Sequence, residues 1–262
     1  MSRLRTVAVT RYVTPLREGG SVPAIVEADD DGMYVLKFRG AGQGPKALIA
    51  ELLAGELARA VDLPVPEIVL IQLDPDLART EPDPEIQDLI RASGGLNVAL
   101  DYLPGAVTFD PVTHQPAAAL ASAIVWFDAF VTNVDRTARN TNMLMWHRQL
   151  HLIDHGAALY FHHDWDDSYL ERSRDPFARI RDHVLLPFAG ALQEAHESMI
   201  ERLTPQLIRS LVTFIPDQLL ADDRAFATPG EFRSAYERYL LRRLEPPHDF
   251  FQEAQRAHAQ LV

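Results

Sequence analysis

Hydrophobic and polar positions alternate with a period of two in the first part of the chain and recur at helical spacing in the rest. The alternating runs are rich in β-branched residues, which predicts strands. The strands predicted in this way are residues 4–13, 33–38, 67–73 and 97–102. Gly19-Gly20 is a turn signal between two strand-like segments and predicts a hairpin with a glycine tip.

Helical spacing of apolar residues predicts one helix early in the chain, over residues 47–61, which the prolines at 64 and 66 end. Residues 117–131 are apolar almost all round, which predicts a buried helix. Further helices are predicted over residues 190–203, 205–213, 229–244 and 249–261. The acidic stretch 74–93 is predicted to be an excursion with a short helix at its end, and the polar stretch 157–174 a surface loop.

Composition places the chain among ordinary globular proteins, with 262 residues, 47% hydrophobic and 24% charged. No apolar run approaches the roughly 20 residues that span a bilayer, and the first ten residues lack the apolar stretch of a signal peptide. The absence of cysteine excludes disulfides and thiolate sites. These observations favour a cytoplasmic protein.

The formal net charge of −12 argues against nucleic acid and acidic membranes as partners, because both are held by clustered Lys and Arg. A nucleotide is still compatible with this charge, since one Lys, backbone amides and a metal ion can hold a triphosphate.

Candidate chemistry is concentrated in residues 127–160. Asp135 follows the buried helix, Asn140 comes five residues later, and Asp154 follows a predicted hairpin of residues 143–146 and 150–153. A carboxylate near a hydroxyl, and carboxylate and amide oxygens for Mg²⁺, are what transfer of a γ-phosphoryl group requires. Each residue alone would more often be a turn or a local ion pair, but their order together is difficult to obtain by chance.

Two features of the first part fit the same chemistry. Lys37 lies in a predicted strand, and an acid on the otherwise apolar helix 47–61, Glu51 or Glu56, would need a cationic partner if it faced inward. A strand Lys and a glycine tip can jointly hold phosphates.

A rival metal-hydrolase site would use the histidines and aspartates that gather at the end of this stretch. They are His151, Asp154, His155, His162, His163 and Asp164. If residues 150–153 form a strand, alternation points His151 and Asp154 to opposite sides, and paired histidines in a loop are more often solvated. We therefore rank this site below the Mg²⁺ site.

The motifs resemble those of the HipA-like kinases, which have the protein-kinase-like fold and share features with the phosphoinositide-kinase branch. The matching residues are Asn133-Val134-Asp135-Arg136 with Asn140, and Ile153-Asp154-His155-Gly156 where many kinases have Asp-Phe-Gly. The stretch AELLAGELARAVDLPVPE is similar to the family's helix and the turn that follows it. The resemblance covers residues 19–156.

The resemblance implies a role for each matching residue. Asp135 would be the catalytic base, Asn140 and Asp154 the Mg²⁺ ligands, and Lys37 the contact to the nucleotide phosphates. Glu51, which is preferred to Glu56 for its spacing from the Leu63-Pro64 turn, would pair with Lys37. The remaining nucleotide contacts would come from Gly19, Gly20 and Ser21 over the phosphates, and from the strand through Leu100, Asp101 and Tyr102 on the adenine.

The expected fold is therefore α+β and two-lobed, with a β-rich nucleotide-binding lobe (residues 1–102) and a mainly helical catalytic lobe (residues 103–262). The expected function is ATP- and Mg²⁺-dependent phosphoryl transfer to a hydroxyl, as by a HipA-like serine/threonine protein kinase. The alternatives are a non-catalytic nucleotide-binding module on the same fold and the His/Asp metal hydrolase. The sequence does not identify the hydroxyl-bearing substrate, which we expect to be a protein.

Overall fold

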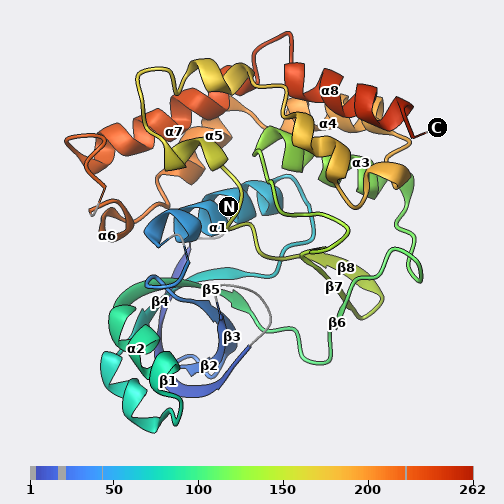
Figure 1. The fold of residues 1–262 in the computed structure, drawn as a ribbon. Coiled ribbons are helices and arrows are strands. Elements are labelled where there is room, and N and C mark those ends of the chain that lie inside the picture. The colour runs from blue at the N-terminus through green and yellow to red at the C-terminus, as the bar shows by residue number, and fades with distance from the viewer. Residues whose placement is uncertain (1–3, 17–21, 43, 222, 262) are drawn as a thin grey trace.

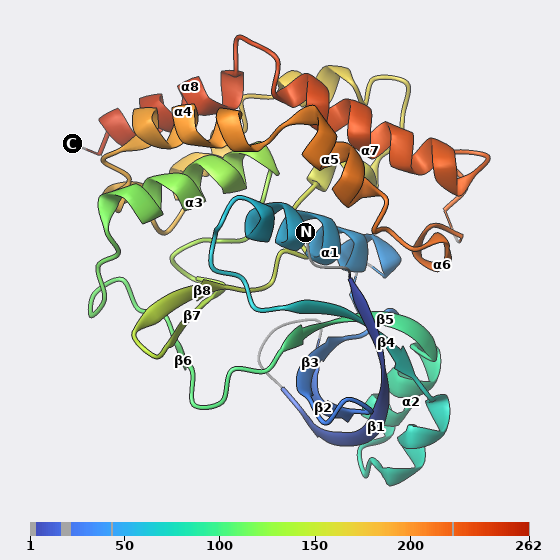
Figure 2. The ribbon, with the colours of Figure 1, turned by 180° about the vertical axis from the view of Figure 1, so that it is seen from behind.

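The computed structural model describes residues 4–16, 22–42, 44–221 and 223–261. A small β-barrel forms one end of the molecule and a larger helical part forms the other (Figure 1). Helix α1 (Pro45–Ala60) lies between the two, as the view from behind also shows (Figure 2). The change from strands to helices follows the change of hydrophobic period along the sequence.

Five strands close into the barrel in the order β1-β2-β3-β5-β4. Their bounds are β1 Arg5–Pro15, β2 Ala24–Ala28, β3 Met33–Lys37, β4 Ile68–Leu73 and β5 Gly95–Asp101. The barrel closes because β1 pairs with β4 in parallel as well as with β2 in antiparallel. Apolar side chains such as Val26, Leu36 and Ile71 fill its core. All four predicted strands are confirmed, with no end shifted by more than two residues.

The acidic excursion contains more structure than expected. It forms a 3-10 helix (Pro75–Thr80) and then α2 (Pro84–Ala92), each begun by an aspartate whose side chain accepts a hydrogen bond from the first turn. Ile86 and Ile90 of α2 are buried in the barrel core.

Helix α1 is buried along most of its length because apolar residues occupy nearly every side of it. Gly55 allows the helix to approach strand β4 closely, since a Cβ at this position would lie 2.3 Å from Ile68 Cδ1. This close contact with β4 fixes the position of α1 against the barrel.

The helical part is built around α3 (Ala118–Phe130), whose Trp126, Phe127 and Phe130 are fully buried. The other helices are α4 Leu192–Arg202, α5 Pro205–Val212, α6 Asp217–Leu220, α7 Pro229–Arg243 and α8 Asp249–Ala259. Helices α4 and α8 contact α3, while α5 and α6 contact α1. The sequence predicted each of these except α6, which is a single turn.

Arg243, the last residue of α7, is buried. Its guanidinium donates to the carbonyls of Ala129 and Phe130 at the end of α3, and to those of Ser173 and Asp175. A cation at a helix C-terminus satisfies the free carbonyls there. Arg243 thereby fixes the end of α3, from which the candidate catalytic loop continues.

Strands β6 (Val107–Thr108), β7 (Met143–Trp146) and β8 (Gln149–Leu152) form a small sheet that lies below α3 in Figure 1. Strands β7 and β8 confirm the predicted hairpin, with Met143 paired to Leu152. The second strand ends one residue earlier than predicted, and strand β6 was not predicted.

The prediction of a surface loop over residues 157–174 was wrong. The segment forms the 3-10 helices Tyr160–His163 and Glu171–Arg174, and its Phe161 and Tyr169 are buried. Single 3-10 turns are too short to leave a period in the sequence.

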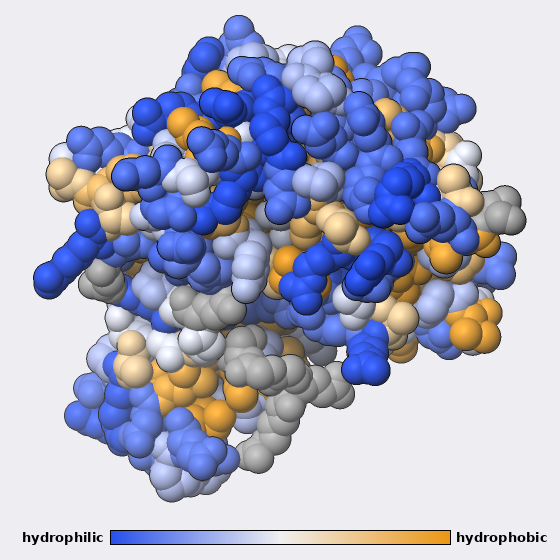
Figure 3. Space-filling view, turned by 45° about the horizontal axis from the view of Figure 1, so that its top comes forward, coloured by the Kyte–Doolittle hydropathy of each residue, from blue (hydrophilic) through white to orange (hydrophobic). Residues whose placement is uncertain are grey.

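The surface of the helical part is mostly hydrophilic on the face shown in Figure 3. Across the residues that the structure describes, none of the helices combines the length and apolar character that crossing a membrane would require. The proposed boundary between residues 102 and 103 stays a prediction.

Candidate phosphoryl-transfer site

Lys37, at the end of β3, lies beside two carboxylates from distant parts of the chain. Its Nζ is 2.8 Å from Asp154 Oδ1 and 3.7 Å from Glu51 Oε2. Glu56, the alternative partner, instead pairs with Arg59 at 2.7 Å on the other side of α1. The structure thus brings Lys37, Glu51 and Asp154 together.

Burial and charge act in opposite directions in this cluster. Burial by itself would raise the pKa of Glu51, but the charge of Lys37 and the contacts with His155 outweigh it and lower that pKa. Burial would likewise lower the pKa of Lys37, yet the charges of Glu51 and Asp154 raise it. Both groups of the pair are therefore charged at neutral pH.

The backbone turn at Asp154 and His155 contacts both Lys37 and Glu51. Asp154 has a positive φ of 57°, a conformation that Asp tolerates better than most residues. The next residue, His155, donates its backbone N–H to Glu51 Oε1 at 3.2 Å. The turn therefore presents the Asp154 carboxylate to Lys37 while it also fixes Glu51.

Asp135 lies in the loop after α3, and its partly buried carboxylate accepts hydrogen bonds from two asparagines. Asn140 Nδ2 is 2.7 Å from Asp135 Oδ2, and Asn142 Nδ2 is 3.3 Å from the same oxygen. Sequence reasoning selected Asn140 but missed Asn142, although the Asn-Thr-Asn spacing of 140–142 was a visible signal. The two asparagines orient the candidate base.

A buried ionic network lies beneath this loop. The carboxylate of Asp128, in the last turn of α3, accepts from Asn133 Nδ2 at 3.0 Å, Arg136 Nε at 2.6 Å and His183 Nε2 at 2.9 Å. Burial would raise the pKa of Asp128, but the charge of Arg136 and the His183 hydrogen bond hold it well below its usual range. Sequence reasoning named Asn133 and Arg136 as motif residues, but it missed Asp128 and His183.

Arg136 also joins the Asp135 loop to the Asp154 turn. Its Nη1 donates to the backbone carbonyls of Asn142 and Ile153, and Ile153 N–H donates to the Asn142 carbonyl at 3.0 Å. The two groups of candidate residues, one around Asp135 and one around Lys37, are therefore parts of one bonded unit.

The family model for HipA-like kinases matches residues 9–253. The chain belongs to the HipA-like kinase family. The matched range includes Lys37, Glu51, Asp135, Asn140 and Asp154, so the resemblance drawn from the motifs is confirmed at the level of the family. A search among curated proteins gave no match.

Two solved structures are similar to this HipA-like kinase. The Helicobacter pylori proinflammatory kinase CtkA has a TM-score of 0.62 and 12% sequence identity, covering 99% of this chain and 100% of that one. The Golgi casein kinase with Mn/ADP bound has a TM-score of 0.51 and 13% identity, covering 97% of this chain and 74% of that one. At such identities the similarity shows the fold alone. The predicted kinase-like fold, β-rich at the N-terminus and mainly helical after it, is confirmed.

The remaining nucleotide contacts predicted for the kinase differ in how far the structure describes them. Gly19, Gly20 and Ser21 lie outside the described residues. On the candidate adenine strand, Asp101 N–H already donates to Glu67 O at 2.8 Å and Tyr102 N–H to Met33 O at 2.9 Å.

Leu100 lies inside the ladder between β3 and β4. The amide donors of Asp101 and Tyr102 are therefore already used within the protein, and the adenine contact through Leu100, Asp101 and Tyr102 stays a prediction.

The rival histidine site loses its support in the described part of the chain, where no three His, Asp or Glu side chains form a group that could hold a metal ion. His162 is buried, not solvated as expected, and its Nδ1 lies 3.0 Å from Tyr236 Oη. The alternation argument used against the site was also wrong at Asp154, because β8 ends at Leu152 and Asp154 lies in a turn.

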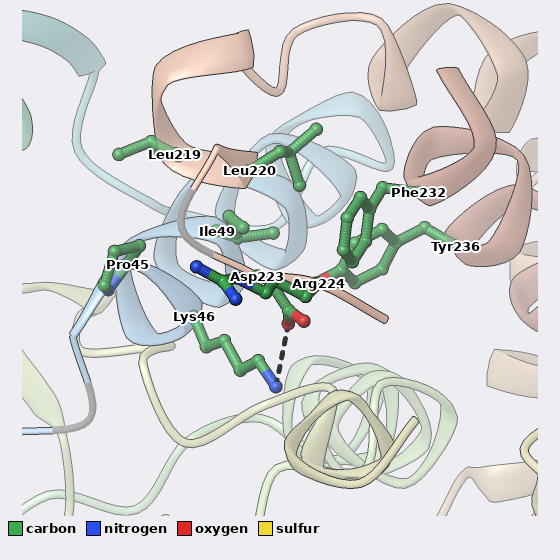
Figure 4. Close-up of a pocket in the computed structure, with 9 residues that line it drawn as sticks. All are labelled: Pro45, Lys46, Ile49, Leu219, Leu220, Asp223, Arg224, Phe232 and Tyr236. Carbon is green, nitrogen blue, oxygen red and sulfur yellow. Dashed lines mark ion pairs between the residues drawn. The ribbon is translucent and has the colours of Figure 1, made fainter. Parts of the chain in front are cut away.

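A cavity of about 400 Å³ opens at the N-terminal end of α1, and Figure 4 shows its walls. It is lined by Pro45, Lys46, Ile49, Leu219, Leu220, Asp223, Arg224, Phe232 and Tyr236. Ile49 and Glu51 are two positions apart on a helix, about 200° around its axis. The cavity therefore lies on the opposite side of α1 from Glu51 and its partner Lys37.

Proposed function

We propose that the chain is an ATP- and Mg²⁺-dependent phosphotransferase that moves the γ-phosphoryl group of ATP to a hydroxyl, as a serine/threonine protein kinase does. The observation that carries the proposal is the bonded unit in which Lys37 with Glu51 and Asp154 adjoins Asp135 with Asn140. Phosphoryl transfer is catalysed mainly by positioning and by charge, and this unit offers both.

The oxygen donors at the site fit Mg²⁺. The Asp154 side chain is 38% exposed and uses only Oδ1 for Lys37, while Asn140 is exposed and offers a neutral amide oxygen. Carboxylate and carbonyl oxygens are the ligands that Mg²⁺ takes, with water and phosphates completing its shell. Held by Asp154 and Asn140, Mg²⁺ would supply positive charge that offsets the charge of the phosphates. The Golgi casein kinase structure, which holds Mn and ADP, supports a nucleotide with a divalent ion.

The protein's own groups would then divide the work. Lys37, held by Glu51, would bind phosphate oxygens, and its raised pKa keeps it charged for that purpose. Asp135 would accept the proton of the attacking hydroxyl, while the amides of Asn140 and Asn142 hold its carboxylate in one orientation.

The basic test is ATP binding with and without Mg²⁺, followed by transfer of labelled γ-phosphate to the protein itself or to a mixture of protein substrates. Mg²⁺-dependent binding and transfer, both lost when EDTA removes the metal, would support the proposal. Nucleotide binding with no transfer to any hydroxyl would favour the non-catalytic alternative.

Asp154→Asn is expected to lower the transfer rate by about 10²–10³-fold, because it removes a charged metal ligand and the partner of Lys37. The Mg²⁺ concentration that gives half-maximal rate should rise in the same variant. The matched control is Asp164→Asn, which changes an aspartate whose side chain is 80% exposed and should leave both quantities as in the parent. Equal Mg²⁺ dependence in parent and Asp154→Asn would remove Asp154 from the metal site.

A further inference from the structure

The backbone on both sides of Asp135 is tied to a single buried carboxylate. Asn133 uses its amide nitrogen on Asp128 and its amide oxygen to accept Asp135 N–H at 3.2 Å. Arg136, on the other side, donates its Nε to Asp128. Asp128 is fully buried, so these bonds do not compete with water. The candidate base therefore has little freedom to move.

The guanidinium of Arg136 forms an ion pair with the buried carboxylate of Asp128. Its side chain is fully buried, with Nε on Asp128 and Nη1 on the carbonyls of Asn142 and Ile153. In kinases that are switched by phosphorylation, a new phosphate orders the activation segment by pairing with an arginine. Here Asp128 already supplies the anion for the arginine beside the base.

His183 ties the far end of the segment after Gly156 to the same network. Its Nδ1 accepts Leu185 N–H at 3.0 Å, so the proton lies on Nε2, which donates to Asp128. Thr137 and His183 form a β-bridge, and Val184 N–H donates to Arg136 O at 3.2 Å. Side-chain and backbone hydrogen bonds therefore connect the end of the segment after Gly156 to the candidate catalytic loop.

The segment between Gly156 and His183 is also ordered by apolar packing and by acid–base pairs within itself. Phe161 stacks on Tyr239 with ring centroids 3.4 Å apart. The hydroxyl of Ser168 donates to Asp166 at 2.7 Å, and Arg172 is already shared by Asp164 and Asp166. A phosphate on Ser168 would face carboxylates, which repel it.

We propose that Asp128 and His183 are positioning residues that hold the catalytic loop from inside the protein, so that the site is assembled without phosphorylation of the segment between Gly156 and His183. The kinetic tests of this proposal depend on the proposed function. Its structural part, that Asp128 and His183 restrict the motion of residues 133–142, can be measured independently of any activity.

The first experiment compares His183→Ala with His183→Gln. Alanine removes the donor to Asp128, whereas the glutamine amide can still donate. We expect kcat to fall about tenfold in His183→Ala with the KM for ATP unchanged, and to recover in large part in His183→Gln. The control is His162→Ala, which removes an equally buried histidine that contacts Tyr236 and should leave kcat unchanged. Equal losses in His183→Ala, His183→Gln and His162→Ala would overturn the positioning role.

Hydrogen exchange of residues 133–142 tests the same role without activity. Exchange should speed up in His183→Ala and return toward the parent rate in His183→Gln, while His162→Ala leaves it unaltered. If the parent transfers no phosphate but the exchange pattern appears, the proposed function fails and the positioning role stands. If the parent is active but exchange in residues 133–142 is the same in all variants, the positioning role fails.

The second experiment concerns modification. Tyr160 is 52% exposed and Ser168 is partly buried, and these are the hydroxyls of the segment that a modifying enzyme could reach. Phosphatase-treated protein carrying Tyr160→Phe and Ser168→Ala is expected to transfer phosphate at the parent rate. A loss of tenfold or more in this variant, or a comparable gain when the parent becomes phosphorylated in the segment, would overturn the claim that the site needs no modification.

Discussion

Asp135→Asn is expected to lower the rate of phosphoryl transfer by about 10²–10⁴-fold, the usual contribution of a positioned general base. The amide cannot accept the hydroxyl proton at neutral pH. It keeps the size of the carboxylate, and one oxygen remains to accept from Asn140. The fold and the affinity for Mg²⁺-ATP should therefore stay close to those of the parent. Single-turnover transfer and equilibrium ATP binding, measured on the same preparation, separate the two effects.

The matched control for this change is Asp167→Asn, on the exposed part of the segment after Gly156. It makes the same chemical substitution away from the loop and should not alter the rate. Parent-like transfer by Asp135→Asn would show that another group accepts the proton. If Asp135→Asn lost both ATP binding and phosphoryl transfer, Asp135 would instead be a residue that binds the nucleotide.

Much of this arrangement was predictable because it depends on local pattern. Strand β3 and helix α1 were both visible as hydrophobic periods, and each carries one half of the Lys37–Glu51 pair. An acid on an apolar helix needs a cation, so the pair itself could be expected before its distance was known. The motif order placed Asp135 and Asp154 for the same reason: both follow elements with strong local signals.

What could not be predicted depends on contacts between distant segments. Asp128 lies on the buried helix α3 and was an acid without a visible partner, but nothing near it in the sequence indicated His183. The burial of His162 against Tyr236 is likewise a contact across 74 positions. The turn at Asp154 broke the strand alternation assumed for it, because a positive φ has no clear signature in a residue other than glycine.

Lys37→Met is expected to lower the stability of the protein strongly, because it leaves the Glu51 carboxylate buried without its cation. Removing one partner of a buried ion pair costs about 3–5 kcal/mol, so the free energy of unfolding should fall by that order. The double variant Lys37→Met with Glu51→Gln removes the stranded charge, and glutamine retains an oxygen for the His155 N–H. We expect the double variant to recover most of the lost stability and to remain inactive, because no cation is left to bind the phosphates.

The dependence of stability on pH distinguishes this explanation from a simple packing defect. In the parent, Lys37 helps to lower the pKa of Glu51 from 4.5 to about 2. The stabilising contribution of Glu51 is therefore complete above pH 4.5 and is lost as the pH falls toward 2. In Lys37→Met the charge that does most to lower the pKa of Glu51 is gone, so burial, which raises that pKa, is opposed only by the contacts with His155. Acidification should then neutralise the stranded carboxylate at a higher pH than in the parent. The stability deficit of Lys37→Met relative to the parent should then shrink as the pH is lowered from about 7 to about 4, and denaturant unfolding at several pH values measures it. A deficit that is constant with pH, and unchanged in the double variant, would mean that lost packing and not the buried charge causes the instability.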